Sequence, residues 1–168
     1  MTRMVLTSDQ TLMSDFRGIP LAQFLSCVPV ERTPEQIYNF IAPYTPHDNG
    51  IALYAPYGLR KVEASLLKEF KRDEVVVAHP QHLSNFIDEG TEVVGIYTMD
   101  PLGIGPVSMM FTYGGQLTAY TSQRFCELLE NLPYGKYKIA VGGTGAWQFE
   151  YRQNLIRELG IDNVVVGE

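Results

Sequence analysis

Cysteine is scarce in this sequence, and the two cysteines that occur lie far apart. Cys27 and Cys126 belong to no C-x-x-C pair, and neither stands at metal-ligand spacing from a histidine. This scarcity excludes a disulfide-stabilised scaffold and a cysteine-ligated zinc module. It is typical of reduced thiols in a cytosolic protein.

Long apolar runs are also lacking. No stretch approaches the roughly 20 residues of a membrane-spanning helix. The N-terminus lacks the succession of basic, apolar and small residues that marks a secretory signal. We therefore expect a cytoplasmic protein without a membrane partner.

Basic charge is not concentrated in any segment. The net charge is -6, from 13 lysines and arginines against 19 acidic residues. The densest basic groups, at 60–61 and 68–72, are interleaved with glutamates and aspartates, as on a solvated helix face. Because nucleic-acid-binding surfaces normally show basic clusters, no nucleic-acid partner is expected.

The sequence does contain a regular alternation of short apolar runs and amphipathic segments. It predicts five strands, over 4–7, 74–78, 93–97, 138–142 and 163–166. It predicts helices over 57–71, 81–88, 119–131 and 146–159, and a short helix that opens at Thr33-Pro34. Strands that alternate with helices form parallel sheets. We therefore predict an α/β fold, a flavodoxin-like three-layer α/β/α sandwich whose five-stranded, mostly parallel sheet has the order 2-1-3-4-5.

The length of 168 residues fits a single α/β domain, residues 1–168. Within it, residues 1–55 combine the first strand with an irregular and helical insertion. Residues 56–168 form the regular α/β part.

Candidate ligand contacts follow the strands, because ligands of open α/β sheets bind at the carboxyl ends of the strands. The candidates are Ser8, Asp9, Gln10, Thr98, Asp100, Gly142, Gly143 and Thr144. The glycines begin the turn Gly142-Gly143-Thr144-Gly145, which matches neither the dinucleotide fingerprint nor a phosphate loop. These segments predict either a cleft for an anionic or nucleotide-like ligand or only the tight turns that a parallel sheet needs.

Other chemistry has weaker support. Asp9 and Asp100 each follow a strand, so together they could coordinate a metal or share acid and base work in a stand-alone small-molecule-binding or hydrolytic enzyme. Such residues more often cap helices or brace turns. The histidines, His47, His79 and His82, predict no site. Neither serine nor cysteine stands in a nucleophile motif, and we assign no catalytic or metal-ligating residue.

Four segments, taken in order, resemble the cobalamin-binding-type (Rossmann-like) domain of radical S-adenosylmethionine iron–sulfur proteins. Residues 55–66, APYGLRKVEASL, are similar to the helix that opens such domains. Residues 92–96, EVVGI, and 139–143, IAVGG, are similar to two of their strands. Residues 161–168, IDNVVVGE, are similar to the segment that leads into the radical barrel.

The resemblance implies an accessory N-terminal domain that holds cofactor or substrate near a radical barrel. It implies cobalamin as a cofactor, bound in part by the glycine turn at Gly142-Gly143. At the place of the D-x-H-x-x-G motif of the family, this sequence has Ser8-Asp9-Gln10-Thr11-Leu12-Met13, without the histidine that ligates cobalt.

The C-x-x-x-C-x-x-C cluster motif is absent from the sequence. The resemblance therefore places the iron–sulfur cluster and S-adenosylmethionine in a further C-terminal barrel, which would be the partner of this domain, and the chain alone is not expected to be catalytic. A small-molecule cofactor or substrate and a second copy of the chain are the other expected partners. The alternative to cofactor binding is a pure interaction or dimerisation module.

Overall fold

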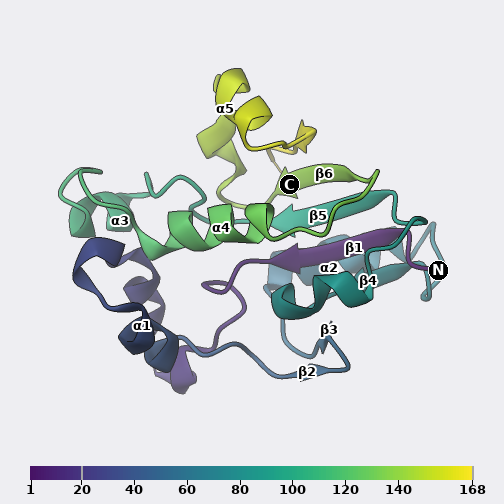
Figure 1. Ribbon diagram of the computed structural model, residues 1–168, viewed down its shortest axis with the longest axis horizontal. Coiled ribbons are helices and arrows are strands. Elements are labelled where there is room, and N and C mark those ends of the chain that lie inside the picture. The colour runs from purple at the N-terminus through teal and green to yellow at the C-terminus, as the bar shows by residue number, and fades with distance from the viewer. Residues whose placement is uncertain (20, 168) are drawn as a thin grey trace.

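The computed structural model describes residues 1–19 and 21–167, and its centre is a five-stranded parallel sheet (Figure 1). The strands are β1 (Met4–Ser8), β4 (Val75–Val77), β5 (Val93–Tyr97), β6 (Lys138–Gly142) and β7 (Asn163–Val164). They pair in the order β4-β1-β5-β6-β7. Counted along the chain without the small hairpin β2–β3, this order is 2-1-3-4-5, so the predicted α/β architecture is confirmed.

The strand register brings the carboxyl ends of three strands to one edge of the sheet. Ser8 of β1 is paired with Tyr97 of β5, and Tyr97 is paired with Gly142 of β6. All strand pairs of this sheet are parallel. The turns that follow β1, β5 and β6 therefore leave the sheet side by side.

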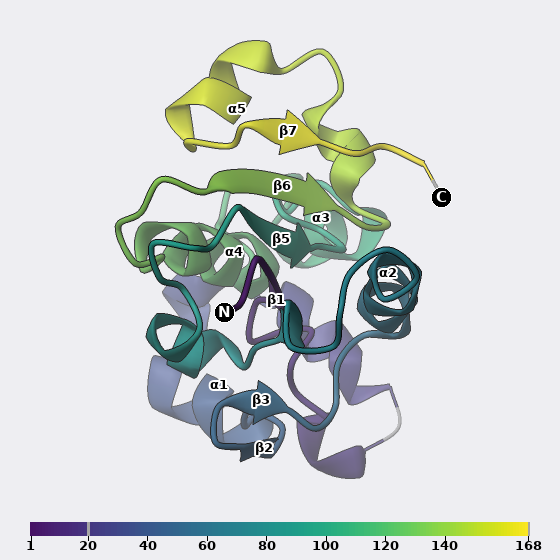
Figure 2. The same ribbon diagram turned by 90° about the vertical axis from the view of Figure 1, so that its right-hand side faces the viewer.

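Helices cover both faces of the sheet, as the view along the sheet shows (Figure 2). Helix α2 (Tyr57–Leu66) packs over β1 and β4, where Leu59 is buried with Leu6 and Val77. Helix α4 (Tyr120–Glu130) lies on the opposite face, where Phe125 and Leu128 join the larger core. β-branched residues buried on both faces explain why β4, with the sequence Val-Val-Val, has no exposed position.

The segment between β1 and α2 is more ordered than its sequence predicts. The predicted irregular and helical insertion contains three short 3₁₀ turns, η1 (Phe16–Gly18), η2 (Ala22–Cys27) and η3 (Val30–Arg32). Helix α1 (Glu35–Ile41) follows, and the hairpin β2 (His47–Asp48) and β3 (Ile51–Ala52) comes next. A separate cluster supports this region, with Tyr38 stacked on Tyr120 of α4 at 3.7 Å between ring centroids.

Three predicted helices are shorter or differently wound than expected. Helix α2 ends at Leu66 rather than at residue 71, and residues 81–88 form only the 3₁₀ turn η4 (Pro80–Asn85), which His82 interrupts with a non-helical backbone. The segment 146–159 is divided into η5 (Ala146–Phe149) and α5 (Gln153–Glu158) because Tyr151 adopts a left-handed backbone with φ +61°.

A further helix, α3 (Pro106–Phe111), follows the turn after β5 and was not predicted from the sequence. None of the helices in the described ranges is long and apolar enough to cross a membrane.

Candidate functional site: a cleft at the carboxyl edge of the sheet

A large cleft lies at the carboxyl edge of the sheet and has a volume of about 930 Å³. Its walls come from the turns after β1, β5, β6 and β7, from η2 and α4, and from the start of α2. This is the place at which open parallel sheets bind ligands, and the volume lies at the upper end of the range for small-molecule sites. The cleft therefore has room for a large ligand.

The glycine turn forms one wall through its backbone. Gly143 has φ +100°, and a Cβ atom there would stand 2.6 Å from the carbonyl oxygen of Thr98. The Thr98 carbonyl also accepts a hydrogen bond from the amide of Gly145 at 3.0 Å. The turn thus needs glycine at position 143, both for its left-handed backbone and for its close approach to the end of β5.

The first turn of α2 forms the facing wall. Gly58 has no space for a side chain, because a Cβ atom would lie 2.4 Å from the ring of Tyr97. Tyr57 and Lys61 of α2 and Trp147 of η5 also line the cleft, and Tyr57 and Trp147 are 77% and 47% exposed. This wall offers aromatic faces and one cation to a ligand.

One buried polar atom in the cleft has no partner. Thr121 of α4 lines the cleft, and its hydroxyl makes no hydrogen bond to any described residue. This oxygen is closed off from solvent, so Thr121 forms part of the wall of the cleft without offering its hydroxyl to a ligand in this structure.

Five of the eight predicted contact residues are placed in or immediately behind this cleft. Gly143 and Thr144 line it. Ser8, Thr98 and Gly142 lie behind it and hold the strand ends together: the Ser8 hydroxyl donates to the Tyr97 carbonyl at 2.7 Å, and the Thr98 amide donates to the Gly142 carbonyl at 2.9 Å.

Asp100 is a brace for the turn after β5. Its carboxylate accepts hydrogen bonds from the amide of Gly105 at 2.8 Å, the hydroxyl of Ser108 at 2.5 Å and the amide group of Gln148 at 2.6 Å. These bonds fix the start of α3 and join it to η5. Both carboxylate oxygens are engaged, so nothing in this geometry favours a catalytic role.

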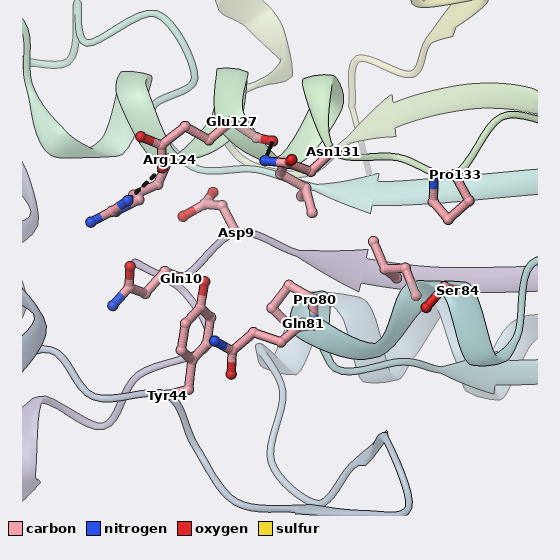
Figure 3. Close-up of a pocket in the computed structure, with 12 residues that line it drawn as sticks. Asp9, Gln10, Tyr44, Pro80, Gln81, Ser84, Arg124, Glu127, Asn131 and Pro133 are labelled. Atoms are coloured by element: carbon pink, nitrogen blue, oxygen red, sulfur yellow. Dashed lines mark hydrogen bonds and ion pairs between the residues drawn. The ribbon is translucent and has the colours of Figure 1, made fainter.

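Asp9 and Gln10 point away from the cleft into a second, smaller cavity on the α4 side of the sheet (Figure 3). Asp9 and Asp100 share no hydrogen-bond partner, and neither of the two cavities is lined by both. The geometry therefore gives no support to a joint site of the two carboxylates.

The three histidines, which predicted no site, lie together. His47 of β2 and His82 of η4 approach to 2.9 Å between their Nε2 atoms, and the ring of His79 stands 4.9 Å from that of His47. His47 Nδ1 accepts a hydrogen bond from the Gly50 amide, which leaves the proton of the neutral ring on Nε2. No group of three or more His, Cys, Asp or Glu side chains in residues 1–19 and 21–167 is arranged to hold a metal.

Several cleft residues were missed because they come from segments with no motif of their own. They include Gln23 and Ser26 of η2, Tyr97, Met99, Thr121 and Trp147. One indication of this wall in the sequence was Gly58, a glycine in the first turn of a helix with one apolar face. A glycine destabilises a helix, so its presence there indicates that another element packs closely against it.

Models of protein families, curated proteins and solved structures were compared with this chain, and none of them matches it.

Proposed function

We propose that this chain is an accessory binding domain whose cleft at the carboxyl edge of the sheet holds a large cofactor of the cobalamin class. The observation that carries the proposal is the cleft itself, which is lined by the close-packed backbone of Gly143, by Thr144 and Lys61, and by the exposed aromatic residues Tyr57 and Trp147. This combination suits a bulky ligand with both flat apolar and hydrogen-bonding parts.

The described residues fit the body of such a cofactor better than its metal. Thr144 and Lys61 offer polar contacts, and Tyr57 and Trp147 offer flat apolar ones. The turn after β1 contributes Thr11 and Leu12 to the cleft, and no histidine lines it. Binding would therefore rest on contacts to the ring and its side groups, without a histidine ligand to cobalt. When bound, cobalamin would supply methyl or radical chemistry of its own.

The resemblance of residues 55–66, 92–96, 139–143 and 161–168 to cobalamin-type domains supports the same proposal. In such proteins an iron–sulfur cluster and S-adenosylmethionine are bound by a separate barrel. We propose the same arrangement for this chain, with the domain holding a cofactor or substrate near that barrel in the cytoplasm. The free thiols of Cys27 and Cys126 fit that compartment.

The test is retention of hydroxocobalamin. The protein is mixed with the cofactor and desalted, and the visible absorption band in the protein fraction is measured. We expect the band to remain with the unmodified protein. Thr144→Trp, which places a large ring at the exposed mouth of the cleft, should abolish retention.

A matched pair of aromatic substitutions separates the cleft from the rest of the surface. Trp147→Ala removes an aromatic wall of the cleft and should weaken retention about tenfold, whereas Tyr134→Ala removes an exposed ring outside both cavities and should not. A colourless protein fraction, or equal retention by Thr144→Trp, would contradict the proposal.

A further inference from the structure

A second cavity, independent of the cleft, lies on the α4 side of the sheet and has a volume of about 270 Å³. Asp9 and Gln10 enter it from the turn after β1, Tyr44 from the segment before the hairpin, and Arg124 and Glu127 from α4 (Figure 3). Leu83 and Leu128 give it an apolar side. A cavity of this size has room for a small molecule of roughly ten heavy atoms.

Asp9 presents an unused acceptor to this cavity. One oxygen, Oδ1, accepts hydrogen bonds from the amide and the hydroxyl of Thr11, at 2.8 and 2.5 Å. The other oxygen, Oδ2, has no hydrogen-bond partner among the described residues, although Asp9 is only 2% exposed. In Figure 3 the carboxyl group of Asp9 points toward α4 and Arg124, and the hydroxyl of Tyr44 points toward Asp9 from the opposite side.

The cation of the cavity is already neutralised. Arg124, 9% exposed, donates to Glu127 at 2.5 Å and to Glu35 at 2.8 Å, so two carboxylates face one guanidinium. The Glu127 carboxylate is further occupied by the amide group of Gln123 at 2.6 Å. The Asp9 carboxylate is therefore the charged group of the cavity that has no ion-pair partner, and its charge is negative.

We propose that this cavity is a binding site for a short aliphatic primary ammonium ion, with Asp9 as the counter-ion. The ammonium group would donate to Asp9 Oδ2 and to the Tyr44 hydroxyl, and the alkyl chain would lie against Leu83 and Leu128. A bare metal ion is a poorer match, because no described cluster of three ligating carboxylates, cysteines or histidines exists and half of the lining is apolar.

The electrostatics of Asp9 agree with this assignment. Burial raises the pKa of Asp9 to about 6, against the opposing effect of the hydrogen bonds from Thr11 and of the backbone amides of Asp9 and Leu12. A carboxylate that burial destabilises in this way gains from a cation that enters the cavity.

The test uses n-butylammonium chloride and sodium butyrate as probes at pH 8, where Asp9 is ionised and the amine is charged, and at matched ionic strength. Binding is followed by chemical-shift changes of backbone amides. We expect saturable changes with butylammonium at roughly millimolar concentration, confined to residues 9–10, 81–84 and 124–131. Residues 143–144 of the cleft should not respond, which separates this site from the proposed cofactor site.

Two substitutions that remove a negative charge provide the control. Asp9→Asn should weaken butylammonium binding at least tenfold, whereas Asp73→Asn, at an exposed position outside both cavities, should leave it unchanged. Tyr44→Phe is a second variant of the site and should weaken butylammonium binding less than Asp9→Asn does. Absence of saturable changes in the unmodified protein up to about 100 mM, equal binding of butyrate, or undiminished binding by Asp9→Asn would each overturn the proposal.

Discussion

At the scale of single residues, Asp9 links the wall of the cleft to the smaller cavity. Its Oδ1 atom holds Thr11, which lines the cleft, and its Oδ2 atom faces the smaller cavity on the α4 side. Position 9 directly follows β1, so its side chain can turn to either side of the sheet. The two hydrogen bonds from Thr11 form an Asx-type turn that fixes the carboxyl group on the α4 side.

The buried carboxyl group of Asp9 should reduce stability at neutral pH. Its pKa in the folded protein is about 6, above the usual 3.8, chiefly because of burial. The protonated form is thus favoured by folding, and the stability it contributes is present below about pH 4 and is lost as the pH rises through 6. Asp9→Asn keeps an oxygen for Thr11 and removes the charge. At pH 7.5 its free energy of unfolding in urea should exceed that of the unmodified protein by roughly 1–3 kcal/mol.

The same comparison at pH 4 supplies the control. There Asp9 is protonated in the folded protein, so the gain should shrink to near zero. An equal gain at both pH values would show that the effect does not come from the charge.

His79 should give the free energy of unfolding the opposite pH dependence, with stability lost at low pH. Burial, followed by the neighbouring His47 and His82, lowers the pKa of His79 to about 4, against an opposing contribution from the Thr45 carbonyl. The neutral ring is favoured by folding, so its contribution is full above about pH 6.5 and is lost as the pH falls toward 4. In the Asp9→Asn background, the free energy of unfolding should decrease by roughly 1–2 kcal/mol between pH 7.5 and 5. Adding His79→Gln should make the free energy of unfolding fall less between pH 7.5 and 5. An unchanged pH dependence would contradict the contribution assigned to His79.

At the scale of elements, the glycine turn after β6 is set by its neighbour strand. The amide and the carbonyl of Thr98 bind the backbones of Gly142 and Gly145, so the turn cannot move away from β5 without losing both bonds. The start of α2 is constrained in the same way by Gly58 against Tyr97. The walls of the cleft are therefore held in place by contacts between elements that lie far apart in sequence.

Gly143→Ala should destabilise the protein by about 2–3 kcal/mol, because the new Cβ combines a left-handed backbone with a contact at 2.6 Å to the Thr98 carbonyl. Gly114→Ala is the matched control. Gly114 has φ +74° but no atom within 4 Å of a Cβ, so only the backbone strain of about 1 kcal/mol applies. Thermal unfolding midpoints of the two variants measure the difference. Equal losses would mean that the close approach at position 143 contributes nothing.

At the scale of the whole molecule, the larger core joins the sheet to the elements of its α4 face. Phe125 of α4 is fully buried and lies 5.9 Å from Phe149 of η5 between ring centroids, in a cluster with Val5, Val94 and Val141 of the sheet. This core supports α4, whose residues line both the cleft and the smaller cavity. Loss of the core should therefore affect both sites through overall stability.

Phe125→Ala should lower the free energy of unfolding by about 3–5 kcal/mol, because it removes apolar contacts and leaves a cavity. Phe24→Ala, at an exposed ring of η2, should cost less than about 1 kcal/mol. Urea titrations compare the two variants. A similar cost for both would contradict the assignment of Phe125 to the main core.

The five strands, their order and the edge of the sheet that carries the cleft could be predicted from the sequence by itself. Each strand is a short apolar run rich in β-branched residues, and such local patterns together with the handedness of β-α-β units leave few arrangements. Gly143 and Thr144 were predicted as cleft residues for the same reason, since they directly follow a strand. The break at Tyr151 and helix α3 were missed, because backbone conformation there depends on neighbours that are distant in sequence.

Only the tertiary structure decided how the polar residues are shared between two cavities. Asp9 and Asp100 look equivalent in sequence, yet Asp100 is saturated by three donors from the Gly105, Ser108 and Gln148 positions, while Asp9 keeps an unpaired oxygen in a cavity. The direction of a side chain after a strand end depends on the turn that follows. The partners it meets come from α4 and from the Tyr44 segment, which only packing brings to it.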